Sequence, residues 1–288
     1  MSPRRASPAQ PTTASWRTPM GKIAEPETIV ADNLSLGWAT VLDRLARPGV
    51  DAISPLSLSI TGFADDGTPV EVPAIRTAID TLLAAKGKRD VENVAWTIFP
   101  QRYWLMSEGS RAVFFEMFRE AFQRIQDYNP QNNKRGSYFQ RMVDFEGGGA
   151  GKNQLAWILD EYDRNPSGRR SKWQATTFDP YRDMLTTAQL EFPCLQQVSF
   201  TFSGDDGLVV NAFYATQQIV HKGYGNYLGL ARLGAFMASQ MHRRLERLNV
   251  FVGIAKMDKI GKTDTDFAAM LATVRAELTT AQGVDQAA

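Results

Sequence analysis

The stretch Phe192-Pro193-Cys194-Leu195-Gln196-Gln197-Val198-Ser199-Phe200-Thr201-Phe202-Ser203 decides the fold. Apolar and polar side chains alternate toward its end, which is typical of a β-strand with one buried face. Ser203 to Gly207 (Ser-Gly-Asp-Asp-Gly) supplies a hairpin turn, so Leu208 to Thr216 is predicted as the partner strand. Cys194, the only cysteine of the chain, lies directly before the first strand.

The segments on either side of this hairpin are predicted to be a mixture of helices and strands. Apolar residues at helical spacing, closed by Pro48-Gly49, predict a first helix from Leu34 to Leu45. The other predicted helices are Ala74 to Ala85, Arg111 to Ile125, Gln154 to Tyr162, Tyr227 to Arg247 and Asp264 to Thr280. The other predicted strands are Leu58 to Phe63, Ser171 to Phe178 and Asn249 to Gly253.

Length and composition limit the classes of protein to which the chain can belong. Its 288 residues, 43% of them hydrophobic, are enough for a sizeable core. A net charge of +1 gives no electrostatic argument for binding nucleic acid or an acidic membrane. The single cysteine fits a reducing cytoplasm. We expect one domain over residues 27–281, with disordered tails at 1–26 and 282–288, and no transmembrane helix.

Several short motifs follow one another in the second half of the chain. They are Asn165-Pro166, Arg169-Arg170, Pro193-Cys194 with Phe200 six residues on, and Asn226 before Ala231 and Leu233. In this order and spacing they resemble the thymidylate synthase and nucleotide hydroxymethylase family. That family has an Asn-Pro-x-Ser-Arg-Arg turn, a Pro-Cys nucleophile before a strand, and a pyrimidine-reading asparagine that opens a helix. The order of the motifs, rather than any one of them, carries the resemblance.

The resemblance implies a fold, a reaction and a set of site residues. The fold is α+β, with a curved, mainly antiparallel sheet, flanking helices and a sheet-packed homodimer. The reaction transfers a one-carbon unit, methyl or hydroxymethyl, from 5,10-methylenetetrahydrofolate to C5 of a pyrimidine nucleotide, without a metal. The implied residues are Cys194 as nucleophile, Arg169, Arg170, Thr216 and Asn226 for the substrate, and Trp96, Tyr138 and Gln218 for the folate. In the family the arginine pair crosses the dimer interface, so the active sites would be shared.

The chemistry explains why a cysteine is needed. C5 of a pyrimidine is a poor nucleophile until a thiolate adds to C6 and converts the ring to an enolate-like species. A free thiol has a pKa of roughly 8.5, and adjacent cations lower it. Arg169 and Arg170 would serve if the chain folds them back to Cys194. An amide at Asn226 can both donate to and accept from the N3–O4 edge of uracil, whereas a carboxylate would better suit cytosine.

Several positions depart from the family pattern. The family histidine after the cysteine is Leu195, its Arg-Ser pair is Ala215-Thr216, and its folate-contacting aspartate is Gln218. The catalytic glutamate is missing unless Asp80 stands in for it, and Gly253 to Asp258 lacks the family's His and Tyr. We therefore do not expect standard methylation of deoxyuridylate.

Other interpretations of the same residues stay open. Cys194 would also suit a small buried position, Arg169-Arg170 a solvated surface, and Asn226 a helix N-cap. Trp96 suits the core equally well, and Gly147 to Lys152 is a hinge rather than a phosphate loop, because Asn153 follows the lysine. For the whole protein the alternatives are folate-independent C5 chemistry, such as exchange or removal of a substituent, and a non-catalytic nucleotide-binding or scaffold protein.

Overall fold

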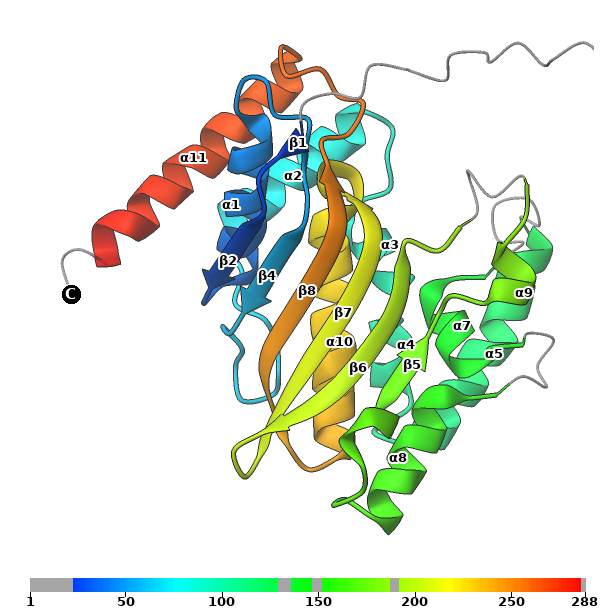
Figure 1. The fold of residues 1–288 in the computed structure, drawn as a ribbon. Helices are drawn as coiled ribbons and strands as arrows, with labels where there is room; N and C mark the ends of the chain where they lie inside the picture. The colour runs from blue at the N-terminus through cyan, green and yellow to red at the C-terminus, as the bar shows by residue number, and fades with distance from the viewer. Residues whose placement is uncertain (1–22, 129–135, 147–151, 187–191, 286–288) are drawn as a thin grey trace, which may run out of the picture.

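A computed structural model describes residues 23–128, 136–146, 152–186 and 192–285. One mixed β-sheet runs through these residues, and helices pack around it (Figure 1), so the chain has the expected α+β class. The expected hinge at Gly147 to Lys152 and most of the expected tail before residue 27 lie outside the described residues. None of the described helices has the length and apolar composition needed to cross a membrane.

Eight strand segments make up the sheet. They are β1 (Ile23–Ala24), β2 (Glu27–Ala31), β3 (Ala52–Ile53), β4 (Leu56–Ile60), β5 (Gln174–Thr176), β6 (Leu195–Ser203), β7 (Gly207–Gln218) and β8 (Arg244–Lys256). β3 and β4 both pair with β8, and β1 and β2 lie outside them. On the other side of β8 the order is β7, β6 and β5. All five predicted strands are therefore present, with shifted ends.

The prediction of a mainly antiparallel sheet is wrong in its central pair. β7 and β8 are parallel along almost their whole length, because the helix between them returns the chain to the same end of the sheet. β2 and β4 are parallel as well, with α1 in between. The hairpin of β6 and β7 is antiparallel as predicted, with Ser203 opposite Gly207.

The helices agree with the predicted positions more closely than the sheet does. Their bounds are α1 (Leu34–Ala46), α2 (Pro73–Ala85), α3 (Val91–Trp96), α4 (Gln101–Met106), α5 (Arg111–Tyr128), α7 (Tyr138–Val143), α8 (Gln154–Arg164), α9 (Pro180–Asp183), α10 (Tyr224–Gln240) and α11 (Thr265–Asp285). α11 and β1 extend the structured part of the chain beyond the expected limits of 27 and 281.

The helix predicted from Tyr227 to Arg247 begins earlier and ends sooner than expected. α10 starts at Tyr224 and stops at Gln240, and His242 then adopts a left-handed φ of 52°. Arg244 already belongs to β8, so Leu245 faces the core from a strand and not from the helix. The apolar spacing of the helix happens to continue into the strand, which is why the pattern alone could not place the boundary.

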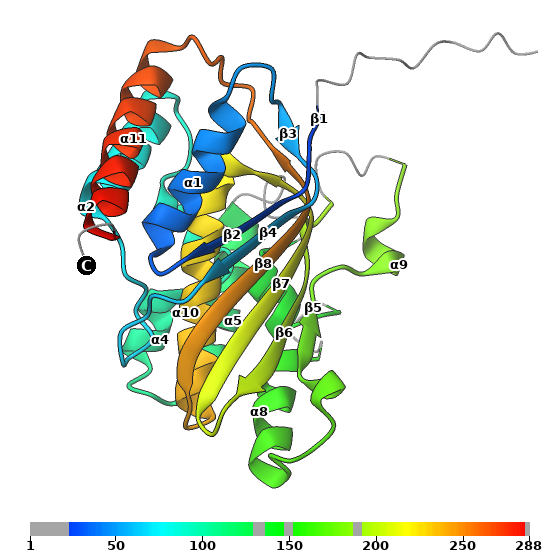
Figure 2. The same ribbon diagram turned by 60° about the vertical axis from the view of Figure 1, so that its left-hand side comes forward.

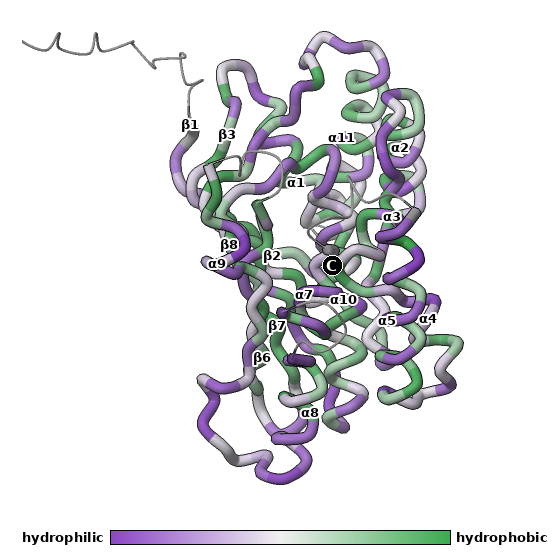
Figure 3. The backbone as a smooth tube through the Cα atoms, turned by 90° about the vertical axis from the view of Figure 1, so that its right-hand side faces the viewer, coloured by the Kyte–Doolittle hydropathy of each residue, from purple (hydrophilic) through white to green (hydrophobic). Residues whose placement is uncertain are grey.

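The core lies between the sheet and the helices on one of its faces. α10 is buried almost all round, and α1, α2 and α10 lie behind the sheet in Figure 1 and to its left in Figure 2. Trp38 of α1 donates from Nε1 to the carbonyl of Ile219 (2.9 Å) and packs edge-on against Tyr224, which fixes the start of α10. Hydrophilic stretches lie on outer loops and also on parts of helices such as α2 and α3 (Figure 3).

The opposite face of the sheet is polar and half-exposed. A ladder of side-chain hydrogen bonds of 2.8, 2.9 and 3.2 Å joins Ser59, Asn249, Asn211 and Thr201 across four strands. Beside it the rings of Phe213 and Phe251 stack with centroids 5.5 Å apart, and 37% and 43% of these two residues is exposed. Two stacked aromatic rings on an open face are unusual for a surface that faces only water.

The close approach of α3 to α10 generates the first testable prediction. A Cβ on Gly225 would lie 2.5 Å from Val94 Cβ and 2.8 Å from the carbonyl oxygen of Val91. Gly225→Ala should therefore lower the free energy of unfolding by about 1–3 kcal/mol, measured by urea denaturation. Gly283→Ala is the control, since a Cβ there meets nothing within 4 Å; it should be neutral or slightly stabilising. Equal stability of the two variants would contradict this packing.

Candidate active site at Cys194

Cys194 lies at one end of the sheet, where the start of β6 and the C-terminal ends of β7 and β8 are side by side. β6 runs antiparallel to β7, and β7 runs parallel to β8, so the start of β6 and the ends of β7 and β8 share one edge (Figure 1). The carbonyl of Cys194 accepts a hydrogen bond from Ala215 N (3.1 Å), and Gln218 of β7 is opposite Lys256 of β8. The hairpin and the crossover together bring these three segments to one place.

Cys194 is half-buried, and its surroundings act on the pKa of its thiol in opposite directions. Burial raises the pKa of its thiol, while the positive charges of Lys222 and Lys256 act to lower it. The net effect of the protein alone is a raised pKa, so the thiol is the favoured form at neutral pH. A nucleophilic role therefore requires a group that removes the thiol proton.

Two tyrosine side chains lie near this cysteine. Tyr138 of α7 is hydrogen-bonded by the main chain of Leu195 and Cys194, and burial raises its pKa. Burial likewise raises the pKa of Tyr214, whose hydroxyl also interacts with the charge of Cys194. Tyr227 donates to Gln217 Oε1 (2.9 Å) and fixes that amide. Two phenols, those of Tyr138 and Tyr214, therefore lie near the thiol, and the amide of Gln217 is bound by a third phenol.

Two of these polar groups are buried without a hydrogen-bond partner in the part of the chain that the structure describes. They are Tyr214 Oη and Gln217 Nε2, and both residues are at most 2% exposed. Leaving a buried donor without a partner costs about 1–3 kcal/mol, so such groups usually have a water or a ligand beside them. These unsatisfied hydrogen-bonding groups indicate that a polar ligand or a water molecule binds beside them.

A second ionisable pair lies in the turn between β7 and α10. This turn, η3 (Ile219–Gly223), is a π-helix, a form often found at functional sites. His221 Nδ1 lies 2.9 Å from Asp258 Oδ1, without the geometry of a hydrogen bond, and its Nε2 is buried with no partner among the described residues. Asp258 Oδ2 accepts from Val220 N (2.7 Å) and so holds the turn to the end of β8.

A buried ion pair supports the site from the other side. Arg141 of α7 donates from both terminal nitrogens to Asp183 (2.7 and 2.9 Å) and to the carbonyl of Thr177 (2.8 Å). The hydroxyl of Thr177 in turn donates to the carbonyl of Leu195, next to Cys194. This chain of contacts ties α7, α9 and the end of β5 to the start of β6.

Asn226 is buried in the first turn of α10, close to the turn that carries Lys222. It is 4% exposed, and it is not the N-cap, because the helix starts at Tyr224 and Gly223 takes the cap position. The N-cap interpretation of Asn226 is therefore wrong. Hydrogen bonding to a bound ligand is one explanation for the burial of the Asn226 amide at this position.

Arg169 and Arg170 do not lie near Cys194 within one chain. They are exposed in and before η1 (Arg170–Lys172), which directly precedes β5. Gln174 pairs with Ser199, and the five residues from Cys194 to Ser199 alone span about 16 Å of strand. The expected folding-back of the arginine pair onto Cys194 in its own chain is wrong, and the lysines occupy that role instead.

The other expected ligand-binding residues are dispersed. Trp96 is half-buried and packs on Phe118 and Phe122, with its ring stacked on Phe122 at 6.5 Å. Thr216 donates to the carbonyl of Ile254 (3.2 Å). Gln218 is exposed at the end of β7, on the Cys194 edge of the sheet. Tyr138 is the one residue of the set that contacts the cysteine segment.

Asp80 is occupied by structural contacts. Its Oδ2 accepts from Arg76 Nε (2.9 Å) and its Oδ1 accepts from Val91 N at the start of α3 (2.9 Å). With both oxygens engaged in contacts that hold α2 to α3, Asp80 has a structural role.

Reasoning from the sequence missed several polar residues at this end of the sheet. They are Lys222, Lys256, Tyr214, Gln217 and the His221–Asp258 pair. None of them belongs to a recognisable motif, and they come from the ends of two different strands and a π-turn. The one available signal was the pattern of two parallel strands joined by a helix, which would have placed residues 218–222 beside 256–258.

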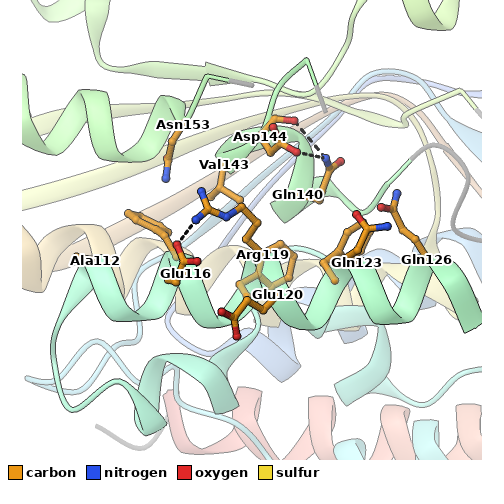
Figure 4. A pocket seen from close by; sticks show the side chains of 13 residues that line it. Ala112, Glu116, Arg119, Glu120, Gln123, Gln126, Gln140, Val143, Asp144 and Asn153 are labelled. Carbon is orange, nitrogen blue, oxygen red and sulfur yellow. Dashed lines mark hydrogen bonds and ion pairs between the residues drawn. The ribbon is translucent and has the colours of Figure 1, made fainter. Parts of the chain in front are cut away.

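A separate pocket of about 360 Å³ lies between α5 and α7 (Figure 4). Its lining includes Phe115, Phe118 and Phe122 of α5, of which Phe118 and Phe122 are buried. Gln140 and Asp144 are hydrogen-bonded at its rim (3.2 Å), and Arg119 contacts Glu116. The residues that line the pocket include none of the groups near Cys194.

Among the described residues, no group of three or more His, Cys, Asp or Glu side chains is arranged to hold a metal ion. Comparison with known proteins adds no family. No protein-family model matches the sequence, and no curated protein matches it either.

The Arg141–Asp183 pair generates a prediction for stability. Asp183→Asn removes the charge of the buried carboxylate that both terminal nitrogens of Arg141 bind, so we expect the free energy of unfolding at pH 7 to fall by about 3–5 kcal/mol in urea denaturation. Asp206→Asn, which breaks an exposed pair with Arg244, is the control and should have no measurable effect.

The same pair predicts a dependence on pH. Burial alone would raise the pKa of Asp183, but its bonds with Arg141 and with Asp179 N hold it below its usual value. A depressed native pKa stabilises the fold above the unfolded value of roughly 3.9, and this stabilisation is lost as the pH falls through the native pKa. The difference between the wild type and Asp183→Asn should therefore narrow below about pH 4. A difference that stays constant to pH 2 would contradict this assignment.

Proposed function

We propose that this chain is a divergent enzyme of the thymidylate synthase and hydroxymethylase type, which transfers a one-carbon unit to C5 of a pyrimidine nucleotide through a covalent adduct at Cys194. The observation that carries the proposal is the position of the only cysteine. It lies at an edge where three strand ends bring together two lysines and several buried, unsatisfied polar groups. A buried cysteine of purely structural function would not need such neighbours.

The proposed chemistry assigns a role to each group. The Cys194 thiolate adds to C6 of the ring, the C5–C6 π electrons move toward the C4 carbonyl, and C5 becomes the nucleophile. The buried amide of Asn226 would read the N3–O4 edge of uracil by donating to O4 and accepting from N3–H. Lys222 and Lys256 supply positive charge where the ring becomes an anion.

The proposed donor is 5,10-methylenetetrahydrofolate, and the residues expected to hold it do not assemble into one site. Trp96 packs on core phenylalanines and the hydroxyl of Tyr138 is engaged by the main chain, which leaves Gln218 as the exposed member of the set. We therefore derive no step through the folate. This observation favours the folate-independent alternative, in which the same adduct exchanges or removes a C5 substituent.

The homodimer is also part of the proposal. The open face of the sheet carries Phe213 and Phe251, and Val30 at its side is 72% exposed. A second copy packed on this face would bury all three side chains. Since Arg169 and Arg170 are distant from Cys194 of their own chain, a dimer is the arrangement in which they could still serve an active site, that of the partner.

The adduct is the direct test of the reaction. Incubation with uracil and cytosine nucleotides, with and without methylenetetrahydrofolate, should give a protein species heavier by one nucleotide in mass spectrometry, and Cys194→Ser should give none. An adduct that requires folate would support one-carbon transfer, and one that forms without it would support the folate-independent alternative. Binding without any adduct would leave a nucleotide-binding or scaffold protein.

The choice of base is tested at Asn226. Asn226→Asp replaces the amide donor by an acceptor, so uracil nucleotides should bind at least about tenfold more weakly in calorimetry, while the ratio shifts toward cytosine nucleotides. Asn93→Asp, at an exposed position of α3, is the control and should change neither affinity. An unchanged uracil-to-cytosine ratio in Asn226→Asp would remove this residue from the site.

The dimer is tested on the open face of the sheet. Phe213→Ser combined with Phe251→Ser should convert a dimer to a monomer in analytical ultracentrifugation at micromolar concentration, because it removes the exposed apolar surface. Val113→Ser, an exposed apolar residue on α5, is the control and should remain dimeric. A monomeric wild-type protein would contradict the proposed dimer.

A further inference from the structure

The pocket between α5 and α7 has no part in the chemistry proposed for Cys194. Its volume of about 360 Å³ is in the range of cavities that bind small organic molecules. Figure 4 shows residues of α5 along one side of it and, on the other side, Gln140 of α7 and Asp144 directly after that helix. A ligand in this pocket would therefore be separate from the proposed nucleotide.

Three phenylalanine rings give the pocket an apolar wall. Phe115, Phe118 and Phe122 are three and four residues apart on α5, so they project from one face of the helix. The rings of Phe118 and Phe122 stack with their centroids 5.4 Å apart. This wall favours a ligand with an aromatic or aliphatic body.

Gln140 contributes a hydrogen-bond acceptor to the same lining. The residue is 6% exposed, and its Nε2 donates to the main-chain oxygen and to Oδ2 of Asp144 (3.2 Å each). Its Oε1 has no hydrogen-bond partner among the described residues. Turning the amide over would set Oε1 against two other acceptors, so the contacts with Asp144 fix its orientation. The group of a ligand that meets Gln140 must therefore be a donor, an N–H or an O–H.

The charged residues of the lining are mainly acidic. Glu116, Glu120 and Asp144 provide three carboxylates against the one guanidinium of Arg119, a formal charge of −2. Arg119 is bound to Glu116 and lowers the pKa of that carboxyl, so Glu116 is charged at neutral pH. An acidic lining favours a cation, and it disfavours a phosphate or a carboxylate.

We propose that this pocket binds a small organic amine in its ammonium form, with an aromatic or aliphatic body. The body packs against the three phenylalanine rings, an N–H donates to Gln140 Oε1, and the acidic residues balance the charge. A quaternary ammonium group would satisfy the charge but not the acceptor, and a carboxylate would satisfy neither. The proposal depends on no step at Cys194.

The class of ligand is tested by calorimetric titration of the full chain with three probes that share one body. They are phenylbutylamine, phenylbutyltrimethylammonium and phenylbutyrate. At pH 7 the amine should bind at one site per chain, and the quaternary ammonium should bind about tenfold more weakly, because it has no hydrogen to donate. The carboxylate should bind more weakly still. Equal affinities for amine and carboxylate, or no saturable binding of the amine at millimolar concentration, would overturn the proposal.

Two variants locate the binding in this pocket. Gln140→Leu should weaken phenylbutylamine about tenfold and leave phenylbutyltrimethylammonium unchanged, so that the two cations bind equally. Glu120→Gln should weaken both cations about two- to fivefold, since an exposed charge is screened by water and salt. Glu25→Gln, an exposed carboxylate between β1 and β2, is the control and should change neither affinity.

A Gln140→Leu protein that keeps the wild-type preference for the primary amine would contradict the proposal. Circular dichroism should show that this variant is folded; if it is not, Glu120→Gln decides, and unchanged affinities for both cations would sink the proposed site. Cys194→Ser should bind phenylbutylamine like the wild type, so failure to form a nucleotide adduct would leave this result unaffected.

Discussion

The parallel pairing of β7 and β8 is the constraint on which the rest of the structure depends. A parallel pair needs a crossover, and α10 provides it by lying across the sheet from one end to the other. The crossover forces the ends of β7 and β8 to one edge, and the tight hairpin places the start of β6 at the same edge. Cys194, Lys222 and Lys256 meet as a result of topology, although 62 residues separate the first from the last.

The helix that makes this crossover is buried along most of its length. Glycines at 225 and 229 let α3 approach its backbone, and Trp38 fixes its first turn through the carbonyl of Ile219. The π-turn before it therefore stands on a rigid base and has little freedom to move Lys222 toward water. Packing of the surrounding core offsets the free-energy cost of the unpaired amine of Lys222 and of the unsatisfied amide and phenol groups.

The sequence predicted the local elements well and the assembly poorly. The hairpin at Ser203 to Gly207 and the helices from Leu34 and Pro73 follow from turn chemistry and from the spacing of apolar residues, which act over a few residues. The end of α10 did not follow, because Leu245 continues the helical spacing from within β8. Parallel pairing, which acts over a distance of dozens of residues, left no local trace.

The same limitation decided which part of the candidate site could be found. Cys194 was identifiable from its place before a strand, and Asn226 from its place at the start of a helix, since both depend on the neighbouring residues alone. Lys222 and Lys256 can be recognised as neighbours of the site only from the strand register, in which Gln218 is opposite Lys256. Arg169 and Arg170 looked suitable as a charge pair, yet β5 carries them to the opposite end of β6.

The exchange of arginine for lysine beside the thiol changes what the site can do. An arginine stays charged at every accessible pH, so it can stabilise a thiolate but cannot take the proton whose removal creates it. A lysine whose pKa is lowered by burial can do both in turn.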